Sequence, residues 1–345
     1  MRLRINDLPT LKPSDSRTLI LSNSHTLIPS MRVLLLSLLA VAGAFFGTIA
    51  AAADKDAPPN LGDETLSKWR FGVIVNARGG NVTGIQATLP VPTDWPEQTI
   101  KIVDEEKSPT VRKIAYRMLD GGVKQMVVTI PRLKAGEEAK AVVTFEIVKR
   151  EILEPGGKQV FVIPARPARD LQKYLLPSPF IESKDPKFTQ IAPQILIRGE
   201  RAWDQTEEIY KFVRDNVKYE FAEDIRPAID ALNDRKGDCE ELTSIFIALC
   251  RASKIPARMV WVPRHCYPEF YLEDQEGRGH WFPCQAAGEA HEFGKMNEKR
   301  PILQKGDNFK VPGDKEPQRY AKQALTATNA DAPPEVKFVM EPVKE

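Results

Sequence analysis

Three residues within one stretch of the chain have the types and spacing of a thiol active site. Cys239 follows Gly237-Asp238 and opens an apolar segment, His265 opens a β-like segment, and Gln285 closes the next one. A cysteine in the first turn of a helix has a lowered thiol pKa, and helix N–H groups there can serve an oxyanion. A histidine can act as the base for such a thiol, and a third polar group can orient its ring. We therefore take these residues as candidate nucleophile, base and orienting group.

The elements around these residues can be predicted from the local pattern. Asp238 is a good N-cap, and an apolar stripe at helical spacing follows it, so we expect a buried helix that stops before Pro256. Residues 258–262, 267–272 and 280–284 are expected to be strands, with a turn at residues 274–279 joining the last two. This arrangement would bring the histidine and the glutamine to neighbouring strands.

The register of those two strands gives a further prediction. If Gln285 faces His265 in an antiparallel pair, then Cys266 faces Cys284 on the other face of the sheet. Directly opposed residues have Cα atoms about 4.5–5.5 Å apart, which allows a disulfide. Cys250 is expected to be a small buried hydrophobe on the helix.

Length and charge narrow the class of protein. The 345 residues are enough for two domains, with 42% hydrophobic and 28% charged side chains. The formal net charge is +2, but without residues 1–53 the chain has 44 basic and 45 acidic side chains. This near-neutral balance argues against a general binder of nucleic acid.

Residues 31–53 have the pattern of a secretory signal peptide. Met31-Arg32 is followed by 21 uncharged residues that end in a run of alanines before Asp54. We expect translation to start at Met31 and the protein to be exported to the periplasm or the extracellular space, with residues 1–53 absent from the mature form. The alternative is an uncleaved anchor, because 21 uncharged residues can just span a bilayer. This segment is the only membrane contact that we expect.

The mature chain divides into an all-β part and a mixed part. Residues 63–153 show short, evenly spaced strands with turn signals, which predicts a β-sandwich acting as a scaffold or recognition module. Residues 154–200 are expected to connect the domains, residues 201–322 to form the domain with the thiol, and residues 323–345 to be a mobile tail.

The segments GDCEE (237–241), ALCRA (248–252) and IPAR (255–258) resemble the core of the transglutaminase-like superfamily. HCYPEFYL (265–272) and WFPCQ (281–285) resemble its histidine segment and its last triad segment. The resemblance implies an α+β protein: an Ig-like β-sandwich, as in many bacterial members, followed by a papain-like core. It further implies that Cys239 attacks a peptide or Gln side-chain amide to form a thioester, with His265 as base and a protein or peptide as substrate.

Gln285 departs from the family pattern, which has Asp at the third position. A neutral amide can orient an imidazole, although it cannot stabilise imidazolium by charge, so we expect reduced or altered activity. The alternative is a binding or scaffold protein that keeps the fold without turnover. Cys266, His280, Cys284 and His291 could instead form a zinc set, but no Cys-x-x-Cys pair is present. We expect no metal, calcium included, and no cofactor, and the sequence does not indicate an oligomeric state.

Overall fold

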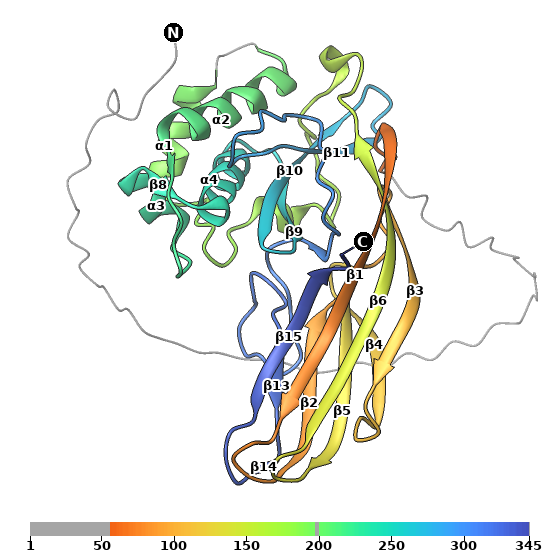
Figure 1. Cartoon of the computed structure of the whole chain (residues 1–345). Coiled ribbons are helices and arrows are strands. Elements are labelled where there is room, and N and C mark those ends of the chain that lie inside the picture. The colour runs from red at the N-terminus through yellow and green to blue at the C-terminus, as the bar shows by residue number, and fades with distance from the viewer. Residues whose placement is uncertain (1–55, 197–199, 345) are drawn as a thin grey trace, which may run out of the picture.

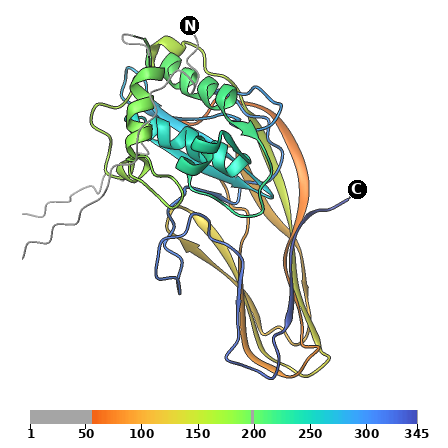
Figure 2. The ribbon, with the colours of Figure 1, turned by 90° about the vertical axis from the view of Figure 1, so that its left-hand side faces the viewer.

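Two antiparallel sheets, formed mostly by the first half of the chain, face each other across an apolar core. The computed structural model describes residues 56–196 and 200–344. One sheet has the order β15-β1-β6-β3 and the other β13-β2-β5-β4, with β14 also pairing with β2. Figures 1 and 2 show these strands as one long body with the helices gathered at its upper end. The strands of the first half are β1 (Leu61–Asn76), β2 (Val82–Pro90), β3 (Gln98–Lys107), β4 (Lys113–Leu119), β5 (Val123–Leu133) and β6 (Glu138–Ile152).

The sandwich forms because alternate residues of these strands are apolar. In β5 the buried positions include Met126, Val128 and Ile130, which meet Phe71 and Phe145 of the opposite sheet in one core. Alternation with a period of two places such residues on a single face, and burying that face stabilises the sheet pair. The expected strands of residues 63–153 are therefore confirmed.

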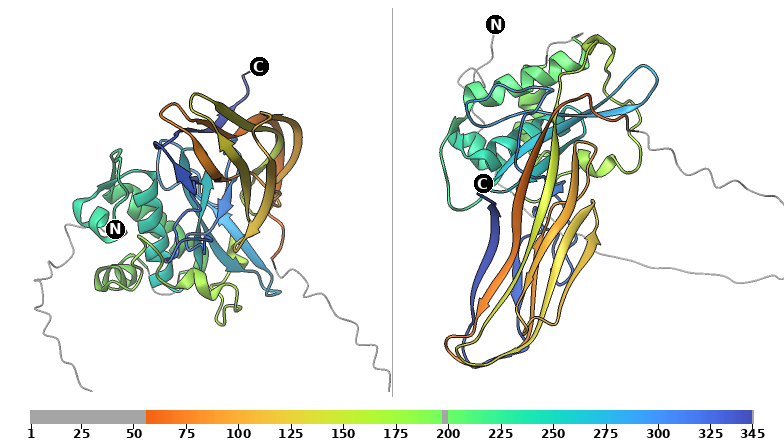
Figure 3. Two further views of the ribbon diagram at one scale, coloured as in Figure 1. Left: turned by 90° about the horizontal axis from the view of Figure 1, so that it is seen from below. Right: turned by 45° about the vertical axis from the view of Figure 1, so that its right-hand side comes forward.

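The last residues of the chain return to the sandwich, and the expectation of a mobile tail was wrong. The strands there are β13 (Ala324–Thr326), β14 (Asn329–Ala330) and β15 (Glu335–Pro342). β15 pairs with β1 along its length, and Phe338 and Met340 pack against the sandwich core. Figure 3 shows β15 beside β1 at the edge of the sheet. Proline and charge in this segment suggested disorder, whereas the free edge of β1 supplied the hydrogen bonds that order it.

The second domain is a helix packed on an antiparallel sheet with the order β11-β10-β9-β12. Helix α4 (Cys239–Ala252) begins where predicted, with Asp238 and Glu241 forming a capping box, and its residues from Glu241 to Arg251 are buried. The sheet consists of β9 (Ala257–Val262), β10 (His265–Glu273), β11 (Gly279–Pro283) and β12 (Gln304–Lys305), while β7 (Lys218–Tyr219) pairs in parallel with β8 (Lys236–Gly237).

Helices α1 (Pro186–Ile195), α2 (Ala202–Asn216) and α3 (Ala228–Asp234) pack around α4. Phe188 and Ile191 of α1, together with Phe161 and Ile181, belong to the same core as α4. The segment 154–200, which we expected to be a connection, therefore contributes to this domain, and it also contains two short 3₁₀ turns, η2 (Lys158–Val160) and η3 (Gln172–Leu175).

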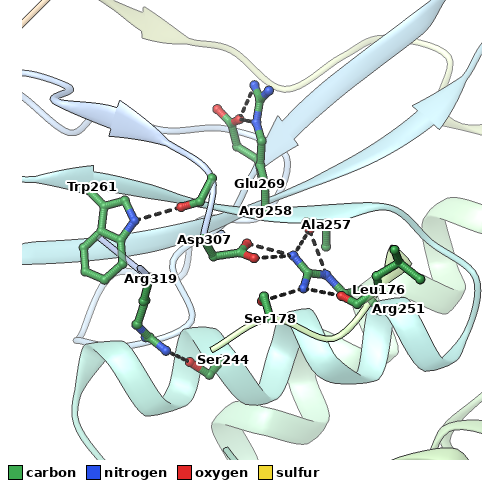
Figure 4. A network of polar contacts seen from close by, with 11 residues as sticks. Leu176, Ser178, Ser244, Arg251, Ala257, Arg258, Trp261, Glu269, Asp307 and Arg319 are labelled. Atoms are coloured by element: carbon green, nitrogen blue, oxygen red, sulfur yellow. Dashed lines mark hydrogen bonds and ion pairs between the residues drawn. The ribbon is translucent and has the colours of Figure 1, made fainter. Parts of the chain in front are cut away.

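Buried charged side chains join the sheet of the second domain to the segments around it. Lys305 lies between Glu97, next to β3 of the sandwich, and Glu269 of β10, at 2.6 and 2.7 Å. Arg258 pairs with Glu269 at 2.7 Å, and Figure 4 shows this pair near a second buried pair, Arg251 with Asp307. Because every charge in these groups has a partner, they fix the orientation of β9, β10 and β12 without leaving an unpaired buried ion.

Candidate active site

Cys239 is the first residue of α4. Its position follows from the capping box, in which the backbone N–H groups of Asp238 and Glu240 donate to the carboxylates of Glu241 and Asp238. Those bonds do not use the N–H of Cys239, which lies at the helix N-terminus where backbone donors lack helical partners. The thiol is only partly buried, so a reagent can reach it.

The pKa of Cys239 is lowered to about 4. A hydrogen bond from the Cys266 thiol is the largest cause, burial of the thiol opposes it, and a hydrogen bond and the charge of His265 lower the pKa further. Thiolate is the nucleophilic form of cysteine, so this sulfur is ionised at neutral pH.

The acidic neighbours of Cys239 do not prevent its ionisation. Burial and a hydrogen bond with Glu241 raise the pKa of Asp238 to about 7. Glu240 also has a raised pKa because of burial, while Arg319 acts in the opposite direction. Nε of Arg319 lies 3.3 Å from the Glu240 carboxylate, and Nη2 of Arg319 donates to the Glu240 carbonyl oxygen at 3.0 Å. A cation from outside the helix thus offsets the negative charge of its first turn.

His265 opens β10, directly after Arg264, which has a left-handed backbone with φ of 60°. Its Nε2 lies 2.9 Å from Oε1 of Gln285. An amide oxygen can only accept, so Nε2 carries the proton and Nδ1 is the nitrogen left for the Cys239 thiol. The structure therefore brings together all three residues selected from the sequence.

Gln285 is held by its backbone as well as by its side chain. Arg214 of α2 donates to the Gln285 carbonyl oxygen at 2.7 Å and to those of Gly288 and Ala290 at 2.8 and 3.1 Å. The N–H of Gln285 donates to the Glu292 carbonyl oxygen at 2.8 Å. With 8% of its surface exposed, the amide of Gln285 meets the histidine in a largely water-excluded place.

The predicted strand register was wrong by two residues, and the disulfide that this register allowed is not formed. Glu269 pairs with Pro283, and β11 ends there, so the backbones of Cys266 and Cys284 do not face each other. All four cysteines are free. The side chain of Gln285 spans the difference in register, and thus its contact with the histidine survives although the backbone pairing assumed for it does not.

Cys266 instead belongs to the thiol site. Its fully buried sulfur lies 3.5 Å from the Cys239 carbonyl oxygen and hydrogen-bonds the Cys239 thiol. Sequence reasoning missed this role because the wrong register directed Cys266 toward Cys284, and it missed Arg214 and Arg319 because both reach the site from segments distant along the chain. The only local signal was the position of Cys266 next to the histidine.

The histidines outside the triad have other surroundings. His280 is partly buried, and its Nε2 lies 3.0 Å from the Asp274 carboxylate. His291 lies exposed in a loop. Within residues 56–196 and 200–344, no group of three or more histidine, cysteine and acidic side chains is placed to hold a metal ion.

Comparison with known proteins shows which family this part of the chain resembles. The model of the transglutaminase-like superfamily matches residues 189–286, from α1 to the residue after Gln285. These residues form a transglutaminase-like core. The matched part contains the capped helix of Cys239 and the strand of His265, so the fold expected from the sequence is confirmed for this domain.

Two solved structures resemble the chain, and no curated protein matches it. One is a "Putative Cysteine Protease" from Cytophaga hutchinsonii, with a TM-score of 0.53 and 16% identity over 82% of this chain and 93% of that one. The other is a "putative protease" from Parabacteroides distasonis, with a TM-score of 0.27 and 13% identity over 61% of this chain and 42% of that one. At such identity the first likeness concerns the fold, and the second carries no argument.

Proposed function

We propose that this protein is a cysteine enzyme that opens amide bonds in polypeptides through a thioester. The observation that carries the proposal is the contact of 2.9 Å between Nε2 of His265 and Oε1 of Gln285, next to a Cys239 thiol that is ionised at neutral pH. A thiolate, a histidine with a fixed tautomer and a third group that fixes it are the parts of nucleophilic amide chemistry.

Each side chain has one task in the proposed reaction. The Cys239 sulfur attacks the carbonyl carbon of a peptide bond or of a Gln side-chain amide, and the N–H groups at the start of α4 stabilise the oxyanion. His265 gives its proton to the departing amine as the C–N bond breaks and the thioester forms. Water or a primary amine then attacks the thioester, which releases an acid or a new amide and restores the thiol.

Gln285 acts as a positioning residue in this mechanism. Its amide oxygen holds the N–H of Nε2, so the ring keeps Nδ1 toward the sulfur. It stabilises imidazolium by a hydrogen bond to a charged group, without the full charge that a carboxylate would add.

We also propose that the enzyme acts outside the cytoplasm. The proposal depends on residues 31–53, whose signal-peptide pattern lies outside the described part of the chain. Among the helices that the structure does describe, none is both long and apolar enough to cross a membrane. Mass spectrometry of the protein secreted by its natural host would show whether the mature chain begins near Asp54.

The proposed activity is tested by labelling followed by turnover. Iodoacetamide is a small amide-bearing thiol reagent. It should alkylate Cys239 at pH 7 in the wild type, and helix α4 of the Cys239→Ala variant should remain unlabelled. Turnover of a mixed peptide library is then measured in two ways. New amines report peptide hydrolysis, and ammonia reports deamidation of Gln side chains.

The result also decides between the enzyme and the alternative of a binding module. Rapid alkylation with amine or ammonia release that Cys239→Ala abolishes supports the enzyme. Alkylation without any turnover favours a binding module that keeps a reactive thiol. No alkylation of the wild type at neutral pH would contradict the assignment of Cys239 as nucleophile.

A further inference from the structure

The segment at residues 219–221 lies beside the start of the nucleophile helix. In the parallel pair of β7 and β8, Tyr219 faces Gly237, and the N–H of Glu220 donates to the Gly237 carbonyl oxygen at 2.8 Å. Phe221 follows two residues after Tyr219, and Cys239, the first residue of α4, follows two residues after Gly237.

Tyr219 and Phe221 project away from the ion pair that anchors this segment. The Glu220 carboxylate contacts Nζ of Lys236 at 2.7 Å. Side chains alternate along an extended chain, so the residues on either side of Glu220 share the opposite face. Burial raises the pKa of Tyr219, and the negative charges of Cys239 and Asp238 add to that increase, which places the phenol within electrostatic reach of the thiol.

Both aromatic side chains are exposed. Tyr219 is 50% exposed, and Phe221, at 73%, is the most exposed of the large apolar residues in the described part of the chain. Single exposed apolar residues are common on protein surfaces, whereas two that share a face beside a reactive thiol form a small apolar patch.

This segment is fastened at both ends. After it, the N–H of Arg226 donates to Glu241 at 3.0 Å, and the Arg226 guanidinium donates to the carbonyl oxygen of Lys236 at 2.8 Å and to Asp234 at 2.9 Å. The aromatic rings are therefore presented by a backbone that is tied to α4 and β8, which is the kind of support that a binding subsite needs.

We infer that Tyr219 and Phe221 form an apolar subsite of the thiol site, which binds an aromatic or branched aliphatic side chain of the polypeptide next to the amide that Cys239 attacks. This inference rests on the proposed function and adds the class of substrate to it. The patch begins at Tyr219, which pairs with Gly237 just before the nucleophile helix and feels the charge of Cys239, so a polypeptide bound across that helix N-terminus would bring an apolar side chain to it.

The subsite is tested with two reagents of equal chemical reactivity. N-iodoacetyl-phenylalaninamide and N-iodoacetyl-glycinamide both alkylate a thiolate, but only the first carries an aromatic ring. Second-order rate constants for modification of Cys239 in the full chain are measured by mass spectrometry. Aromatic contacts of this size should make the phenylalanine reagent about fivefold to tenfold faster with the wild type.

Three variants test whether the apolar surface of Phe221 causes the preference for the phenylalanine reagent. Phe221→Ser should bring the ratio of the two rate constants closer to one, because only Tyr219 of the subsite remains, and Phe221→Leu should keep most of the wild-type ratio, because an apolar surface remains. Met118→Ser removes a comparably exposed apolar side chain, 59% exposed, from β4 of the sandwich, and it should leave the ratio at the wild-type value. Using a ratio cancels any general change in the reactivity of the thiol.

Two results would overturn the inference. One is a ratio near one for the wild type while both reagents modify Cys239. The other is an unchanged ratio in Phe221→Ser. In both cases the thiol still reacts, so the proposed function would stand without this subsite, whereas failure of both reagents and of iodoacetamide to modify Cys239 would overturn both.

Discussion

Replacing Gln285 by alanine should raise the pKa of Cys239. The substitution removes the acceptor, 2.9 Å away, that holds the N–H of His265 in a place where the glutamine is 8% exposed. A hydrogen bond to a charged group contributes about 1.5 kcal/mol or more, and one pKa unit corresponds to about 1.4 kcal/mol. This hydrogen bond favours imidazolium, and imidazolium stabilises the thiolate. Loss of the hydrogen bond should therefore raise the pKa of Cys239 by about one unit.

The pH dependence of iodoacetamide labelling measures this change. In the wild type the labelling rate should follow the thiolate fraction, with a midpoint near the pKa of about 4 and a plateau above pH 5. In Gln285→Ala the midpoint should lie near pH 5. The labelling rate of this variant should therefore be below that of the wild type at pH 5 and equal to it at pH 8. Turnover should fall about tenfold, since the base is no longer oriented.

Gln285→Glu is the matched control, because it keeps the length of the side chain and adds a charge. Its carboxylate would stabilise imidazolium, so its midpoint should lie below that of Gln285→Ala. The reasoning fails if Gln285→Ala has the midpoint and turnover of the wild type, because the contact of 2.9 Å would then have no influence on the thiol.

Three further substitutions test other contacts. Cys266→Ala should raise the pKa of Cys239, because it removes the hydrogen bond that lowers this pKa most, and labelling at pH 5 should slow. Asp307→Ala should lower the free energy of unfolding by about 3–5 kcal/mol in urea titrations, since it leaves the buried Arg251 unpaired. Gly72→Ala should cost about 1–3 kcal/mol in the same titrations, because its Cβ would lie 2.1 Å from a carbonyl oxygen of β6.

The two substitutions that test stability, Asp307→Ala and Gly72→Ala, each have a control of the same type. Glu335→Gln breaks an exposed ion pair with Arg78 and should change stability by less than about 1 kcal/mol. Gly156→Ala places a methyl group where nothing lies within 4 Å and should be within about 0.5 kcal/mol of the wild type. If a variant and its control change the free energy of unfolding equally, then neither burial of the ion pair nor steric crowding at the glycine determines the size of the effect.

Helix α4 and the strands of the first half were predictable because their signals are local. The capping box lies within four residues, and the alternation of β5 within eleven. The register of β10 and β11 was not predictable from the same signals, because it depends on how the turn at residues 274–278 closes. The pairing of β15 with β1 joins residues such as Phe71 and Met340, and no pattern in either segment identifies the other.

The sequence by itself determined the types of the chemical groups, the helix that presents Cys239 and the choice of His265 and Gln285 as its companions. Each of these follows from residue type and short-range spacing. The tertiary structure decided that Cys266 donates to the nucleophile rather than pairing with Cys284, that Arg319 offsets the acidic first turn of α4, and that Tyr219 pairs with the residue two positions before Cys239. Those relations depend on which elements pack together, and packing joins residues that the chain keeps far apart.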